Sequence, residues 1–286
     1  MNAVQKTSDS CCGFNKARWL CIAVYLMLTV ISGYIYYGVM KDLIPILLVL
    51  SLFAAVFLHG LVRYGLKNLL VFFIITWVIS SFFEALSIQT GFPFGHYFYD
   101  QLAGPRIFQV PMIIMLAYFS MGYTSWMLAN VLLGQYGRRI SGNGLLFIPL
   151  IAAFIMVMWD VCMDPIASTI GSLWKWQDGG RYFGVPLQNY FGWFFVVYLI
   201  FQVFAFYISK FDRVDGVNKG LYLGKFFWFE SVAVYAIQAL TQLLDPLIQT
   251  QHLDIYGPMA MITIFTMVFV ALLAGIKIYN DETGLL

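Results

Sequence analysis

The chain has 286 residues, of which 61% are hydrophobic and only 10% are charged, and its formal net charge is +2. Its mean hydropathy is +0.81, so it has too little polar surface to cover a soluble globule of this length. The composition therefore predicts a membrane protein. The small net charge gives no reason to expect nucleic acid as a partner.

Apolar runs long enough to cross a bilayer recur along the whole chain. A hydrocarbon core about 30 Å thick needs roughly 20 apolar residues per helix. The candidate runs are 17–38, 43–60, 69–88, 109–133, 144–164, 189–208, 221–244 and 257–278. We therefore expect an all-α, polytopic integral membrane bundle of about eight transmembrane helices with repeated hairpins.

The loops are too short to hold a separate soluble domain, so we expect one integral membrane domain, 1–286. Within it we distinguish a short tail (1–16), two N-terminal helices (17–68) and a hairpin-repeat catalytic core (69–286). If the N-terminus is cytoplasmic, twelve of the 16 Lys and Arg residues fall on the cytoplasmic side. The positive-inside rule then predicts cytoplasmic N- and C-termini, in the plasma membrane.

A six-residue phrase occurs twice in the chain. Arg106-Ile-Phe-Gln-Val-Pro111 and Arg181-Tyr-Phe-Gly-Val-Pro186 share the pattern Arg-x-Phe-x-Val-Pro, and each opens a long apolar run. Acids precede both phrases at the end of the previous run, Glu84 before the first and Asp160 with Asp164 before the second. Charged groups at the edge of the hydrocarbon are costly, which favours a functional role. The pattern predicts a membrane enzyme built from repeated hairpins.

Glu84 is the first candidate catalytic acid. It shares one helical stripe with Trp77, Ser80 and Ser87, which points toward neighbouring helices. A half-dehydrated carboxyl group about one turn from the helix end can hold a proton near neutral pH. The alternative is a structural acid that pairs with Arg106 or bonds to the serines.

Asp160 and Asp164 are the second candidate. They lie one helical turn apart on the same face, so their charges would be about 5 to 6 Å apart and one of them should stay protonated. Pro165 is expected to end the helix and leave Asp164 in the wetter position, which favours Asp160 as the acid. The alternative is that Asp164 only forms a turn with Pro165.

Three further polar residues complete the predicted catalytic set. Asn189 opens the run after the second phrase, four residues before Trp193, and should face the acids. Glu230 lies near mid-membrane, where an ionisable residue is a functional hypothesis, although a pair with Lys225 or an interhelical hydrogen bond is the structural alternative. Asp245 precedes a proline, as Asp164 does.

Aromatic residues gather in the outer loops. A turn around Pro93 and a later loop supply rings at the depth of the lipid headgroups, where an ordinary aromatic belt is the structural alternative. The predicted substrate-binding residues are Phe94, His96, Tyr97, Tyr99, Trp174, Trp176 and Trp193. His96 alone can also be read as a solvated surface residue.

Motifs that bind redox or nucleotide cofactors are missing from the sequence. It has no G-x-G-x-x-G after a strand, no P-loop and only three, widely separated histidines. We therefore expect no cofactor and no metal. The remaining chemistry is addition of water to an electron-rich alkene: a carboxylic acid protonates the alkene, aromatic rings stabilise the tertiary cation by roughly 0.5 to 2 kcal/mol each, and a carboxylate steers water.

Several motifs in fixed order also resemble a known family. They are Glu84, Gly91-x-Pro-Phe-Gly-x-Tyr-x-Tyr99, Val110-Pro111, Asp164-Pro165, Trp174-x-Trp176 and Gly184-Val-Pro-x-x-Asn189 with Gly192-Trp193. Over about residues 70–250 the chain resembles the carotenoid biosynthesis membrane proteins, which include the carotenoid 1,2-hydratases of bacteria and the bisanhydrobacterioruberin hydratases of archaea. Tyr118 departs from the pattern, since a tryptophan is expected there.

The resemblance implies hydration of the terminal double bond of an acyclic carotenoid (ψ) end group to a tertiary alcohol, without a redox cofactor. The implied partners are an acyclic carotenoid, or another long isoprenoid, that enters from the lipid phase, and membrane lipid itself. The assignment of catalytic residues rests on the chemistry above and not on the resemblance.

Two other classes of function fit part of the pattern. A polyprenyl transferase could use Asp160 and Asp164 to hold Mg²⁺ and a diphosphate, and its activity would depend on the metal. A proton-coupled transporter could use Glu84, Glu230 and the repeated hairpins, and it would accumulate a solute without forming a covalent product.

Overall fold

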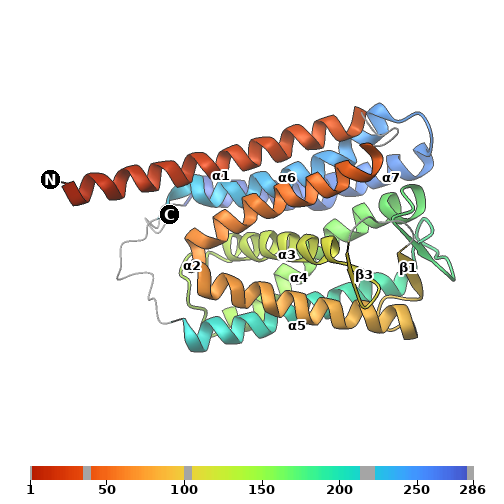
Figure 1. Cartoon of the computed structure of the whole chain (residues 1–286), viewed down its shortest axis with the longest axis horizontal. Coiled ribbons are helices and arrows are strands. Elements are labelled where there is room, and N and C mark those ends of the chain that lie inside the picture. Colours follow the sequence, from red (N-terminus) through yellow and green to blue (C-terminus); the bar gives the residue numbers. More distant parts are fainter. Residues whose placement is uncertain (1, 35–39, 100–104, 213–222, 282–286) are drawn as a thin grey trace.

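A computed structural model describes residues 2–34, 40–99, 105–212 and 223–281. The chain is an elongated bundle of helices with small two-stranded sheets near one end (Figure 1). Within the described residues, seven helices are long and apolar enough to cross a membrane. The prediction of an all-α, polytopic membrane protein is therefore confirmed.

The helices follow the predicted apolar runs. They are α1 (Asn2–Tyr34), α2 (Met40–Thr90), α3 (Met112–Leu132), α4 (Gly144–Asp164), α5 (Leu187–Phe211), α6 (Gly224–Ile248), α7 (Leu253–Thr263) and α8 (Phe269–Tyr279). Two π-helical turns, η1 (Pro165–Ile170) and η2 (Ile264–Val268), extend α4 and join α7 to α8. The segment that contains α7, η2 and α8 is a single span.

The long helix α2 contains two of the predicted crossings. It is broken at Gly65, whose φ of 70° and ψ of 166° are not helical, and only glycine adopts this conformation without strain. The two halves of α2 run in opposite directions from this point (Figure 1). The eight predicted crossings therefore correspond to the seven helices, because one helix turns back on itself.

The α-helical part of this span ends at Asp164, as predicted, but the loop expected at Pro165 is absent. The chain continues past Asp164 into the π-helical turn η1, with Pro165 as its first residue. Pro246 likewise lies inside α6 and does not end it. Proline lacks a backbone N–H, but a membrane helix tolerates it where local π adjustments and neighbouring groups satisfy the freed carbonyls.

The repeated phrase folds in the same way both times. In its first copy, β2 (Arg106–Ile107) pairs with β3 (Val110–Pro111) across a tight turn. In the second copy, Tyr182 forms the matching bridge to Val185. Pro111 and Pro186 then cap α3 and α5 with nearly equal backbone angles.

The turn residues of the two copies also share an unusual conformation. Phe108 and Gln109 have φ values of 48° and 70°, and Phe183 and Gly184 have 51° and 92°. Two successive residues with positive φ are typical of the hairpin turns that match the twist of paired strands. The sequence repeat is therefore a structural repeat, as predicted.

A second sheet joins the two repeats to each other. β1 (Tyr97–Tyr99) follows the first acidic helix, β4 (Trp174–Trp176) follows the second, and the two strands pair antiparallel. Tyr97 lies opposite Trp176, and Tyr99 lies opposite Trp174. The segments that follow the two acidic helices therefore form one aromatic cap.

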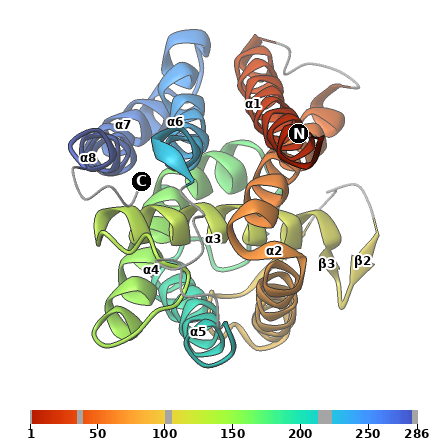
Figure 2. The same cartoon turned by 90° about the vertical axis from the view of Figure 1, so that its left-hand side faces the viewer.

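The bundle has two sides. Seen from the end where α1 begins, α6, α7 and α8 lie together and α5 lies across the bundle from them (Figure 2). Helices α1 and α6 pack in parallel, because Arg18 contacts Glu230 and, further along both helices, Tyr25 contacts Gln238. α1 begins and α8 ends at the same end of the bundle (Figure 1).

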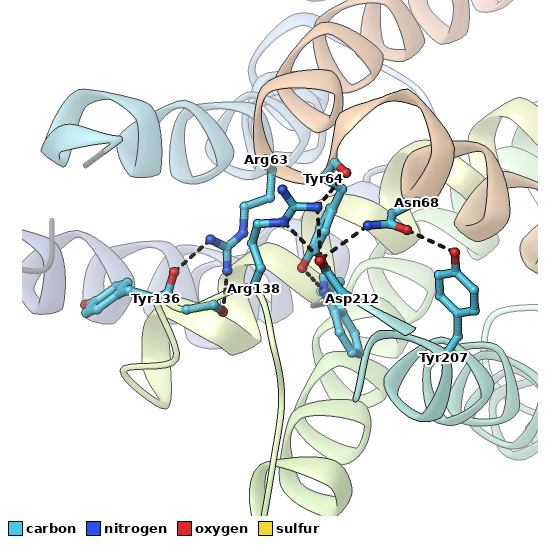
Figure 3. Close-up of polar contacts among 9 residues, drawn as sticks. Arg63, Tyr64, Asn68, Tyr136, Arg138, Tyr207 and Asp212 are labelled. Atoms are coloured by element: carbon cyan, nitrogen blue, oxygen red, sulfur yellow. Dashed lines mark hydrogen bonds and ion pairs between the residues drawn. The ribbon is translucent and has the colours of Figure 1, made fainter. Parts of the chain in front are cut away.

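A buried polar network closes the end of the bundle away from the β1–β4 sheet (Figure 3). Arg138 forms an ion pair with Asp212 at 2.9 Å. Asn68 donates a hydrogen bond to the same carboxylate at 3.2 Å. Arg63 donates to the backbone oxygen of Tyr136 at 2.7 Å. These bonds tie the bend of α2 to the loop before α4 and to the end of α5.

Candidate functional site

A cavity of about 310 Å³ lies near the β1–β4 sheet, between the two sides of the bundle. Residues of α1 through α7 line it, together with the strands β1 and β4. Most of the lining is apolar, including Leu48 and Leu52 of α2 and Met121 of α3. The two N-terminal helices thus contribute to the cavity, although they were predicted to lie outside the catalytic core.

Glu84 lies at the cavity wall and accepts hydrogen bonds from three tyrosines. Tyr118 donates to Oε1 at 2.6 Å, whereas Tyr97 and Tyr99 donate to Oε2, the latter at 2.9 Å. The glutamate is buried. The expected partners are engaged elsewhere: Ser87 donates to a backbone oxygen and Arg106 donates to the oxygen of Tyr99.

The two tyrosines of β1 can act only as neutral hydrogen-bond donors to Glu84. Burial, reinforced by the neighbouring Glu84, holds the pKa of Tyr97 and of Tyr99 well above the ordinary value of a phenol. Both phenols therefore stay protonated at neutral pH. Each can donate to Glu84 without becoming a charged group itself.

Asp160 and Asp164 share one amide. Asn189 Nδ2 donates to Asp164 Oδ2 at 2.7 Å and to Asp160 Oδ2 at 3.2 Å. Trp174 Nε1 donates to the other oxygen of Asp164 at 3.0 Å. Both aspartates are 1% exposed, so the predicted difference in hydration is not seen. Asp164 lines the cavity, and Asp160 is not among its lining residues.

Aromatic rings form much of the wall around these acids. Trp193 stacks on Tyr118 with ring centroids 4.4 Å apart, and Trp159 meets Trp193 edge-on at 6.1 Å. Trp176 lies 5.1 Å from the ring of Tyr97. Because Trp193 also follows Asn189 by one helical turn, the first turns of α5 face both acidic groups, as predicted.

The predicted substrate-binding residues separate into two groups. Those that line the cavity are Phe94, Tyr97, Tyr99, Trp174, Trp176 and Trp193. His96 does not line it, because its exposed side chain points to Asp178, with Nδ1 and Oδ2 3.4 Å apart. The solvated alternative describes His96 better than a substrate contact does.

Glu230 lies outside the cavity. Its carboxylate pairs with Arg18 of α1, with Nε and Oε2 2.6 Å apart, and both side chains are buried. Lys225, the partner expected from its nearness in sequence, donates instead to the backbone oxygen of Tyr279. Asp245 does line the cavity, on the side of α6. Glu84, Asp164 and Asp245 therefore line one cavity. Asp160 does not line it but is hydrogen-bonded to Asn189, which does. Glu230 is the one predicted acid that lies elsewhere.

Two groups of lining residues were not found from the sequence. Tyr118 was noted only as a departure from a pattern, although it donates to Glu84. Tyr25 and Thr29 of α1 also line the cavity. Their spacing of four residues in an otherwise apolar helix was the signal that could have indicated an inward polar stripe.

Comparisons with known proteins identify a family for this chain. The profile of a family described as "Carotenoid biosynthesis protein" matches residues 43–249. The bisanhydrobacterioruberin hydratase of Haloarcula japonica is 30% identical over 111 residues, which cover 38% of this chain and 36% of that protein. The matched part is thus about a third of the relative's length. No solved structure shows a significant match.

The family match spans the acids, both copies of the Arg-x-Phe-x-Val-Pro phrase and the β1–β4 sheet. It therefore covers more than half of the chain and nearly all of the cavity wall. The chain is an integral membrane protein that belongs to the carotenoid biosynthesis protein family.

Proposed function

We propose that this protein is a carotenoid hydratase, which adds water to the terminal C=C bond of an acyclic carotenoid (ψ) end group by acid catalysis. The observation that carries this proposal is the convergence of Glu84 and Asp164 on one aromatic-walled cavity within a membrane bundle. The hydratase relative adds support from sequence. Family membership supports a carotenoid as the substrate.

In this proposal the pair of aspartates supplies the proton. Two carboxyl groups that share a single amide donor in a poorly hydrated place resist carrying two charges, so the pair retains one proton. Asp164 delivers it, because Asp164 lines the cavity and Asp160 does not. This moves the proton donor one turn along α4 from Asp160, which the sequence favoured.

The proton adds to the less substituted carbon of the terminal alkene and leaves a tertiary cation. The stacked rings of Tyr118 and Trp193, with Trp174 nearby, are suited to stabilise that cation through their π faces. A water molecule then bonds to the cationic carbon and gives up a proton to the aspartate pair, which restores the acid. Glu84, which three phenols hold as an acceptor, is our candidate to orient this water.

We also propose a plasma membrane location with both termini in the cytoplasm. Arg63, which is buried, and Arg138, which is partly buried, lie at the bend of α2 and in the loop before α4, at the end of the bundle where α1 begins. The cavity lies toward the other end, near the β1–β4 sheet. Such a distribution agrees with the positive-inside rule. The substrate would then reach the cavity from the surrounding lipid in the outer half of the membrane.

The proposal is tested by expressing the chain in a lycopene-producing bacterium and analysing the pigments by mass spectrometry. We expect a gain of about 18 mass units per modified end. Asp164→Asn and Glu84→Gln should abolish the product while the protein remains in the membrane, and Asp254→Asn, at an exposed acid, is the matched control. Unchanged pigment with the wild-type protein present would overturn the proposal. Full activity in both variants would overturn the residue roles.

A further inference from the structure

A second set of polar side chains lines the same cavity on the side formed by α1 and α6. It consists of Thr29 of α1 with Gln238, Gln242 and Asp245 of α6, and we call it the amide strip. The α6 residues follow one another at intervals of four and three, so they share one helix face. Helices α1 and α6 lie across the bundle from α5 (Figure 1). The hydration steps proposed above use none of these residues.

The register between α1 and α6 places Thr29 level with Gln242. The contacts of Arg18 with Glu230 and of Tyr25 with Gln238 span 212 and 213 positions. With the same difference in residue number, Thr29 lies beside residues 241 and 242 of α6. The two polar side chains therefore lie at about the same depth along the two helices, and both line the cavity, but no hydrogen bond joins them.

Gln242 has an unmet need for a hydrogen-bond donor. Its side chain is 2% exposed, and its Oε1 accepts no hydrogen bond from the part of the chain that the structure describes. The side-chain oxygen of Gln238, one turn earlier, accepts a hydrogen bond from the Tyr25 hydroxyl. A buried amide oxygen without a donor is destabilising. A pure hydrocarbon that covered Gln242 could not supply one, so the fitting occupant carries an O–H group.

The rest of the cavity suits an apolar chain. Ile44, Leu48 and Leu52 of α2 line it beside the strip, as is usual where a few polar groups orient an otherwise hydrophobic ligand. We propose that the amide strip binds the hydroxyl group of an isoprenoid alcohol, with Gln242 Oε1 as acceptor. The inference rests on the proposed function for the isoprenoid nature of the ligand, and it makes Gln242 a determinant of specificity.

The test is equilibrium binding of tritiated geranylgeraniol to the purified full-length protein in nanodiscs. The matched ligand is tritiated geranylgeranyl methyl ether, which has the same chain but no donor. We expect the alcohol to bind about 10-fold more tightly than the ether. Gln242→Met, a change of similar shape, should lower the affinity for the alcohol to that for the ether.

Two further variants test whether a lost preference comes from any Gln-to-Met change or from misfolding. Gln202→Met makes the same change in α5, at an amide that donates to Leu145 and does not line the cavity, and it should keep the preference. Thr29→Val should reduce the preference and serves if Gln242→Met fails to fold, as judged by size-exclusion chromatography. Equal binding of alcohol and ether to the wild type, as expected if only water occupies the strip, would overturn the inference. So would a preference that survives in a folded Gln242→Met protein.

The binding experiment tests the amide strip, and the pigment experiment tests the hydratase proposal, so the two can fail independently. A preference for the alcohol without any gain in pigment mass would leave the amide strip standing and remove the hydratase proposal. A gain in mass without a preference for the alcohol would do the reverse.

Discussion

Tyr118 and Trp193 stack face to face, with ring centroids 4.4 Å apart and 4° between the ring planes. Tyr118 follows Pro111 by seven positions, and Trp193 follows Pro186 by the same number. They are therefore equivalent residues of the two repeats, and the repeats meet ring to ring at the cavity wall. Tyrosine in place of tryptophan at the first position puts a hydroxyl group 2.6 Å from Glu84 Oε1.

Tyr118→Phe removes that hydroxyl and keeps the stacked ring. We expect kcat/KM for hydration to fall about 10- to 100-fold, the loss typical of one hydrogen bond to a carboxylate, with the amount of bound pigment unchanged. Tyr123→Phe, at a tyrosine that contacts His59 outside the cavity, is the control. A Tyr118→Phe protein with wild-type turnover would show that this bond has no part in the chemistry.

Asn189→Leu removes the amide that both aspartates share. The carboxyl groups of Asp160 and Asp164 then lose their common donor, so we expect turnover to fall by about 100-fold or more. The measurement is product formed per mole of protein in isolated membranes. Gln188→Leu, one residue earlier on α5, removes hydrogen bonds to Gly91 and Pro93 and should have a smaller effect.

Glu230 is expected to stabilise the fold and not to catalyse. Glu230→Gln or Arg18→Met alone leaves one partner of a buried ion pair without the other, which destabilises a protein by about 3–5 kcal/mol. Replacing both residues by methionine should recover much of the thermal stability in detergent and retain hydration activity. Loss of activity in a stable double variant would instead return Glu230 to the catalytic set.

Gly65→Ala tests the reversal inside α2. A side chain at φ 70° and ψ 166° is strained by about 1–3 kcal/mol, although nothing lies within 4 Å of the added carbon. We expect a lower unfolding temperature in detergent. Gly257→Ala is the comparison, since that site also has open space and lies within α7. Equal stability of the two variants would contradict the account of the bend.

Chelation separates the hydratase from a metal-dependent prenyl transferase. Across the described ranges, no group of three or more His, Cys, Asp or Glu side chains is arranged to hold a metal ion. We expect hydration to proceed at an unchanged rate in EDTA, measured on isolated membranes supplied with lycopene. A rate that falls with chelator and returns with Mg²⁺ would favour the transferase.

Local features of the fold were predictable from the sequence because they depend on short stretches of chain. The number of membrane crossings follows from counting the apolar runs that are long enough to span the bilayer. The Arg-x-Phe-x-Val-Pro phrase predicted two helix starts because Pro111 and Pro186 suit the position before a helix. The shared face of Asp160 and Asp164 follows from helical periodicity.

Features that depend on distant contacts were not predictable in this way. Arg18 lies 212 positions from Glu230, so the nearer Lys225 was the natural expectation. The hydroxyl of Tyr118 reaches Glu84 only because α3 packs on α2. The continuation past Pro165 depends on how the neighbouring backbone satisfies the freed carbonyls, which a local rule about proline does not include.

The sheet that pairs Tyr97 with Trp176 has a consequence for how such a protein can arise. Each repeat supplies one acidic helix, one strand of the cap and one stacked ring, so neither repeat alone encloses the acids. A single copy would therefore supply only one strand of the cap and one ring of the stacked pair. Once both copies lie in one chain, each half is free to diverge, as the phenol-bound Glu84 and the amide-bound Asp164 already have.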